Sequence, residues 1–124
     1  MDPNTPILVG VAAFQQKNAD FREALEPLAI MERSLRDAAA DAGAPSLLAR
    51  ADEILVPKGI WSYSDPGRLL AASLGANSAR SVLAEIGVSQ QTLLTRACQK
   101  ISSGEASVVL VTGAEAKYRA RCFA

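Results

Sequence analysis

The chain has 124 residues, the length of one compact domain or of part of one. Thirteen Lys and Arg residues balance thirteen Asp and Glu residues and are scattered along the chain, so nothing in the charge points to nucleic acid. A hydrophobic content of 49% predicts a packed core. The sequence has no His, and its two Cys are too few for a disulfide framework, so we expect neither a metal site nor structural disulfides.

The N-terminus shows neither a targeting signal nor a membrane span. Its first residues carry no basic region, and the apolar run after them is short and interrupted by glycine. We therefore expect a cytoplasmic protein. The same run, residues 6–14, has the length and continuity of a central strand in a parallel sheet, and we predict it as the first strand.

A helix and a second strand are predicted next. Pro27 suits the first turn of a helix, and Gly43 ends that helix. Residues 53–57 then form a short apolar run bounded by turn residues, which predicts a strand. The apolar stripe of the helix consists of Leu28, Met31, Leu35, Ala38, Ala39 and Ala42.

A second helix and a third strand follow. The pair Asp65 and Pro66 is typical of a helix start, and Gly75 marks the end of that helix. Residues 79–86 alternate like a half-buried strand, which is the third. The loop before this helix carries Trp61 and Tyr63.

The last helix and strand give the clearest pattern in the chain. Ser89 can cap a helix that Gly104 ends, and residues 107–112 form a run rich in β-branched residues. The apolar helix residues are Leu94, Cys98 and Ile101, with Leu93 and Ala97 beside them. The order β-α-β-α-β-α-β predicts a mainly parallel sheet in a three-layer αβα architecture, as one domain over residues 1–124.

This last region resembles the nucleophile-helix region of thiolases, and of acetyl-CoA acetyltransferase-like proteins in particular. The residues that carry the resemblance are Gly87-Val88-Ser89-Gln90-Gln91, 97–104 and Val108 to Glu115. Residues 5–11, 52–54 and 65–71 resemble the opening segments of the same N-terminal half. The resemblance implies a strand order of 79–86, 53–57, 6–14 and 107–112, then a fifth strand and a second half with the catalytic histidines and a second cysteine. By this comparison the domain is incomplete.

The resemblance also implies acyl transfer to or from CoA in lipid metabolism, with CoA or acyl-CoA as substrate. The nucleophilic cysteine of the family would fall at or next to Gly87 in this chain. Cys98 lies about three helical turns further on and cannot replace it. We therefore expect this chain alone to be inactive. The alternative is a non-catalytic module that binds acyl-CoA or a partner protein.

Candidate ligand contacts have structural alternatives. Ser89, Gln90 and Gln91 begin a helix, where an acyl group could lie, but a cap and solvated side chains explain them as well. Trp61 and Tyr63 follow a strand and could line an acyl or pantetheine pocket or pack on a neighbouring element. Cys98 is expected to be a buried, inert thiol, and Cys122 to have no role. Gly113 is expected to allow a tight exit from the last strand and Glu115 to be a hydrogen-bonding anchor.

The partner predictions concern the third strand. The resemblance implies a homodimer in which this strand pairs antiparallel with its copy. The predicted interface consists of Ser81, Val82, Leu83, Ala84, Glu85 and Ile86. An uncovered edge strand would otherwise invite aggregation, which gives a physical reason to expect some partner. A C-terminal thiolase half and a small lipid-binding subunit are the other partners considered.

Overall fold

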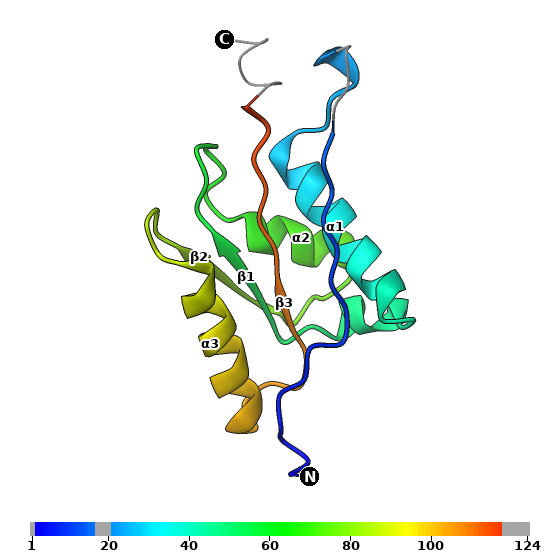
Figure 1. Ribbon diagram of the computed structural model, residues 1–124, viewed down its shortest axis with the longest axis vertical. Helices are drawn as coiled ribbons and strands as arrows, with labels where there is room; N and C mark the ends of the chain where they lie inside the picture. Colours follow the sequence, from blue (N-terminus) through cyan, green and yellow to red (C-terminus); the bar gives the residue numbers. More distant parts are fainter. Residues whose placement is uncertain (1, 17–20, 118–124) are drawn as a thin grey trace.

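A computed structural model describes residues 2–16 and 21–117 of the chain (Figure 1). These residues contain two short 3-10 helices, three α-helices and three strands, joined by loops. Their order is η1 (Phe21–Glu23), α1 (Pro27–Asp41), η2 (Pro45–Arg50), β1 (Glu53–Pro57), α2 (Pro66–Leu74), β2 (Arg80–Ala84), α3 (Gln90–Ser102) and β3 (Val109–Val111). None of the described helices is both long enough and apolar enough to cross a membrane.

The helices begin and end close to the predicted residues, because local backbone chemistry determines these positions. Pro27 is the first residue of α1. At the start of α2, the Asp65 side chain accepts a hydrogen bond from the Arg68 N–H at 3.3 Å. Gly75 follows α2 with a φ of +77°, a left-handed conformation that glycine adopts without steric cost. The predicted caps and stops of α1 and α2 are therefore confirmed.

The sheet has three parallel strands in the order β2-β1-β3. β1 pairs with β2 from Glu53 opposite Arg80 to Pro57 opposite Ala84. It pairs on its other side with β3, beginning with Glu53 opposite Val109. Ile54, Leu55 and Val56 of the central strand are completely buried. The strands predicted at 53–57, 79–86 and 107–112 are confirmed, with shorter bounds for the last two.

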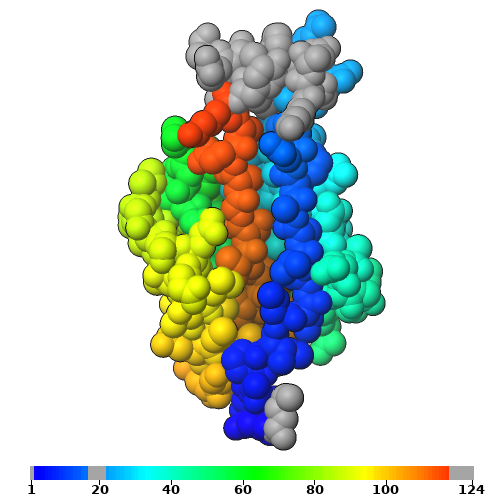
Figure 2. Space-filling view, viewed as in Figure 1, coloured from blue at the N-terminus to red at the C-terminus, as the bar shows by residue number. Residues whose placement is uncertain are grey.

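Residues 6–14 are not a strand, so their predicted place between 53–57 and 107–112 is wrong. β1 and β3 are direct neighbours. The segment runs in an extended conformation beside α1 (Figures 1 and 2). Gly10 approaches this helix so closely that a Cβ would lie 2.2 Å from the carbonyl oxygen of Ala38. The Val11 N–H donates to the Asp41 carboxylate at 3.0 Å. An apolar run can indicate the length of a strand, but it does not determine the hydrogen-bonding partner of its backbone. In this chain residues 6–14 contact α1 instead of a strand.

The sheet separates two hydrophobic clusters and so gives the three predicted layers. On one side, α1, η2 and α2 pack over Ile54 and Val56. On the other side, α3 packs over Leu55 through Leu93 and Ala97. Among the described α-helices, Figure 1 shows α3 apart from α1 and α2. The α/β fold class with helices on both faces is thereby confirmed.

Asp52 holds the three strands together at their amino ends. Its carboxylate accepts hydrogen bonds from the backbone N–H groups of Ser107 at 2.7 Å and Val108 at 3.1 Å. Its own carbonyl oxygen accepts from the Arg80 N–H at 2.9 Å. Asp52 therefore joins the segments that lead into β2 and β3. Its hydrogen bonds align the amino ends of the three strands.

The end of α3 carries an exposed ion pair between Lys100 and Glu105. Lys100 Nζ lies 2.6 Å from Glu105 Oε2, and this hydrogen bond and the lysine charge lower the pKa of the Glu105 carboxyl. We expect Lys100→Ala to raise the pKa of Glu105 toward its ordinary value, as measured by NMR titration. Because the folded pKa is lowered, the small stabilisation exists above the ordinary carboxyl pKa and disappears as the pH falls through the folded value. An unchanged Glu105 titration would contradict this assignment.

Candidate functional site

The loops after β1 and β2 lie at the same end of the sheet, because the two strands are parallel neighbours (Figure 1). The Lys58 N–H donates to the Ala84 carbonyl oxygen at 2.8 Å and so ties the two strand ends together. Open α/β sheets bind ligands beyond the carboxyl ends of their strands. Every residue predicted from the sequence as a ligand contact lies in one of these two loops or in the first turn of α3.

The turn before α3 contains Gly87, at or next to which the resemblance places the nucleophile. Gly87 has a φ of +99°, and no atom lies within 4 Å of the position that its Cβ would take. The Val88 N–H donates to the Glu85 carbonyl oxygen at 3.1 Å and closes the turn. The turn is thus exposed and spacious, but it presents no thiol.

Ser89 is the N-cap of α3, as predicted. Its hydroxyl oxygen accepts from the Thr92 N–H at 3.3 Å and lies 3.1 Å from the Thr92 hydroxyl oxygen. Gln90 and Gln91 follow in the first turn and are exposed. Capping engages the Ser89 hydroxyl, and the sequence has no His that could take its proton. These contacts support the structural interpretation of Ser89.

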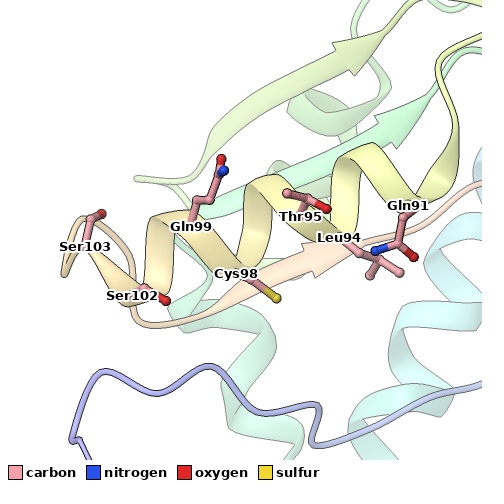
Figure 3. A pocket seen from close by; sticks show the side chains of 7 residues that line it. All are labelled: Gln91, Leu94, Thr95, Cys98, Gln99, Ser102 and Ser103. Atoms are coloured by element: carbon pink, nitrogen blue, oxygen red, sulfur yellow. The ribbon is translucent and has the colours of Figure 1, made fainter.

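An open hollow of about 520 Å³ runs along the outward side of α3 (Figure 3). Its lining consists of Gln91, Leu94, Thr95, Cys98, Gln99, Ser102 and Ser103. All seven residues are uncharged and come from α3 or its last turn, and Gln91 is the one predicted ligand contact among them. Trp61 and Tyr63 do not line it.

The face that α3 turns to the sheet differs from the predicted one. Leu93 and Ala97 are buried, with 3% and 9% of their surface exposed, whereas Leu94 is 43% exposed. Cys98 is an exposed free thiol, so the prediction that it is buried is wrong. Consecutive helix residues point about 100° apart, and both stripes have helical spacing, so the sequence alone did not determine which one faces the sheet. Cys122 lies outside the described residues.

The loop after β1 holds its two aromatic residues by specific contacts. The Trp61 indole N–H donates to the Ala114 carbonyl oxygen at 2.9 Å. The ring centroids of Trp61 and Tyr63 are 5.3 Å apart, and the Leu28 N–H donates to the Tyr63 hydroxyl oxygen at 3.2 Å. The loop is thus fixed to α1 and to the segment after β3. These contacts support the packing interpretation of both rings.

Glu115 and Lys58 complete this arrangement. Glu115 accepts the Ile60 N–H at 2.8 Å, so its predicted role as a hydrogen-bonding anchor is confirmed. The sequence analysis did not identify Lys58 as part of this loop structure. Its Nζ lies 4.5 Å from the centroid of the Trp61 ring and donates to the Trp61 carbonyl oxygen. A lysine directly after a buried strand and close to a tryptophan is the signal that could have indicated it. Gly113 packs against the Pro57 ring, where a Cβ would come within 3.0 Å.

The predicted dimer residues lie on and after an edge strand of the described sheet. Ser81, Val82, Leu83 and Ala84 belong to β2 and are half-buried, while Glu85 and Ile86 follow it and are exposed. The Arg80 N–H and the Ala84 carbonyl bond toward β1. Because backbone groups alternate along a strand, the N–H and C=O groups of residues 81, 83 and 85 point to the open edge.

The titratable groups of the described residues form no metal-binding cluster: no three His, Cys, Asp or Glu side chains gather as a ligand set. The best-packed charged pair lies away from the two loops. The Arg96 guanidinium of α3 contacts the Glu53 carboxylate of β1 at 3.1 Å, and the Glu53 side chain is only 7% exposed. This pair positions α3, and with it the turn at Gly87, on the sheet.

Comparison with known proteins shows a structural likeness. No protein-family model matches the sequence, and no curated protein matches it. A solved structure, that of a monomeric SCP2-thiolase-like protein type 1 from Mycobacterium smegmatis, matches with a TM-score of 0.69 and 26% sequence identity. The match covers 90% of this chain and 24% of the other. The chain therefore has a thiolase-like fold and spans about a quarter of the length of the thiolase-like protein that it matches.

Proposed function

We propose that this chain is the N-terminal part of a thiolase-like protein of the acetyl-CoA acetyltransferase type, which transfers acyl groups to or from CoA in lipid metabolism. The observation that carries the proposal is the thiolase-like fold over 90% of the chain, with α3 beginning at a turn beyond the carboxyl end of β2. A helix start there offers free backbone N–H groups to a developing negative charge. The matched protein is several times longer, so the activity of a whole protein goes beyond what this chain contains.

The chain by itself is not catalytic under this proposal. Thiolase-type acyl transfer needs a nucleophile and a group that moves its proton. The resemblance places the cysteine at or next to Gly87, where this sequence has no Cys, and the sequence has no His. Ser89 is engaged as a cap, and Cys98 lies on the outward side of α3, remote in sequence from the turn.

We expect the isolated chain to show no thiolysis of acetoacetyl-CoA above the rate of a buffer control. The reason is the absence of an activated nucleophile at the start of α3. The measurement is the CoA-dependent loss of acetoacetyl-CoA at increasing chain concentrations, with the Cys98→Ala variant as the matched control. Turnover that rises with chain concentration and disappears in Cys98→Ala would show that the exposed thiol acts as a nucleophile and would overturn the proposal.

The second candidate function is a non-catalytic module that binds acyl-CoA or a partner such as a small lipid-binding subunit. The open hollow along α3 is the surface at which this candidate is tested, because its uncharged lining suits the acyl or pantetheine part of such a ligand rather than its phosphates. Calorimetric titration with acyl-CoA separates the two candidates. Saturable heat that Thr95→Arg abolishes would support binding at the hollow, whereas the first proposal expects no saturable heat from this chain alone.

The edge of β2 is the proposed dimer interface. With residues 81, 83 and 85 presenting outward backbone groups, a two-fold axis at Leu83 would place Ser81 opposite Glu85 of the second copy. No like charges then face each other across the axis. The support for this interface is the exposed edge of β2 alone, because the matched protein is described as monomeric and offers no precedent for a dimer. A C-terminal half of the same fold is the alternative partner for the chain.

We expect Leu83→Pro to halve the mass of the protein in light scattering. Proline removes the Leu83 N–H, which points away from β1, so the ladder with β1 keeps its hydrogen bonds. Val82→Pro is the matched control, because its N–H points toward β1 and its loss should unfold the sheet, seen as a change in circular dichroism. A wild-type protein that is already a monomer, or a folded Leu83→Pro variant of unchanged dimer mass, would refute the β2 interface.

A further inference from the structure

We draw no further inference here: the strongest candidate, the open hollow along the outward side of α3 with its single free thiol at Cys98, is an unpartnered helix face, and nothing in the structure shows what covers it.

Discussion

Replacing Arg96 with Met is expected to lower the free energy of unfolding by about 2–4 kcal/mol, because the change leaves the Glu53 carboxylate buried without its cation. Glu53 lies on the central strand, and its side chain is 7% exposed. The Glu53 carboxylate is 3.1 Å from the Arg96 guanidinium. The Arg96 side chain is 36% exposed, which moderates the expected loss. Urea unfolding at neutral pH measures the effect, with an unchanged m-value expected.

The double variant Glu53→Met with Arg96→Met is the matched control. Removing both charges leaves no uncompensated carboxylate, and methionine retains most of the buried volume. We therefore expect the double variant to recover most of the stability lost by Arg96→Met alone. A double variant less stable than the single one would mean that the Glu53 side chain stabilises the fold through contacts other than its ion pair with Arg96. Equal stability of Arg96→Met and the wild type would show that the ion pair does not hold α3.

Two adjacent leucines on α3 allow a second test with a large effect. Leu93→Ala is expected to cost about 3 kcal/mol, since Leu93 is 3% exposed and packs with Leu55 and Ala97 under the helix. Leu94→Ala should cost less than about 1 kcal/mol, because Leu94 is 43% exposed. Both substitutions remove the same atoms and give the same helix propensity, so the difference reports burial alone.

Chemical denaturation of the two leucine variants under identical conditions gives the comparison. A chain with a total stability of about 5–15 kcal/mol would lose a large share of it in Leu93→Ala. If Leu94→Ala proved the more damaging change, α3 would turn its other stripe to the sheet, and the burial of Cys98 predicted from the sequence would be restored. Equal losses would indicate that both stripes are covered in solution.

The sequence was sufficient for the local features of the fold. Pro27, Asp65 and Ser89 each sit at a helix start, because a fixed φ or a side-chain acceptor acts within one turn and needs no distant partner. The strand at Glu53–Pro57 was also recognisable, since a fully buried central strand is apolar along most of its length. These features follow from short stretches of chain.

Features that depend on a distant partner were less predictable. Residues 6–14 have the composition of a strand, but their extended backbone lies against α1, where Gly10 allows close approach. The Leu94 and Cys98 stripe satisfied helical spacing as well as the Leu93 and Ala97 stripe did. Composition and spacing indicate that a surface is apolar, but not which element packs against it. The predictions were therefore wrong about the partner of residues 6–14 and about which side of α3 faces the sheet.

For the candidate site, the location was predictable and the contacts were not. A loop after a parallel strand and a helix start after its neighbour must lie at one sheet end, which is where Trp61 and Ser89 are found. The hydrogen bond from Trp61 to Ala114 and the position of Lys58 over the ring join segments far apart in the chain. Such long-range contacts leave no periodic signal in the sequence.

The backbone at Gly87 limits how this turn could change over evolution or in the laboratory. With a φ of +99°, residue 87 holds a conformation that costs an L-amino acid about 1–2 kcal/mol. A cysteine there would strain the turn even though the space for its side chain is free. Val88 is not in a positive-φ conformation, since every such residue in the described chain is a glycine. A thiol is therefore better introduced at position 88, because a cysteine at position 87 would carry this conformational cost.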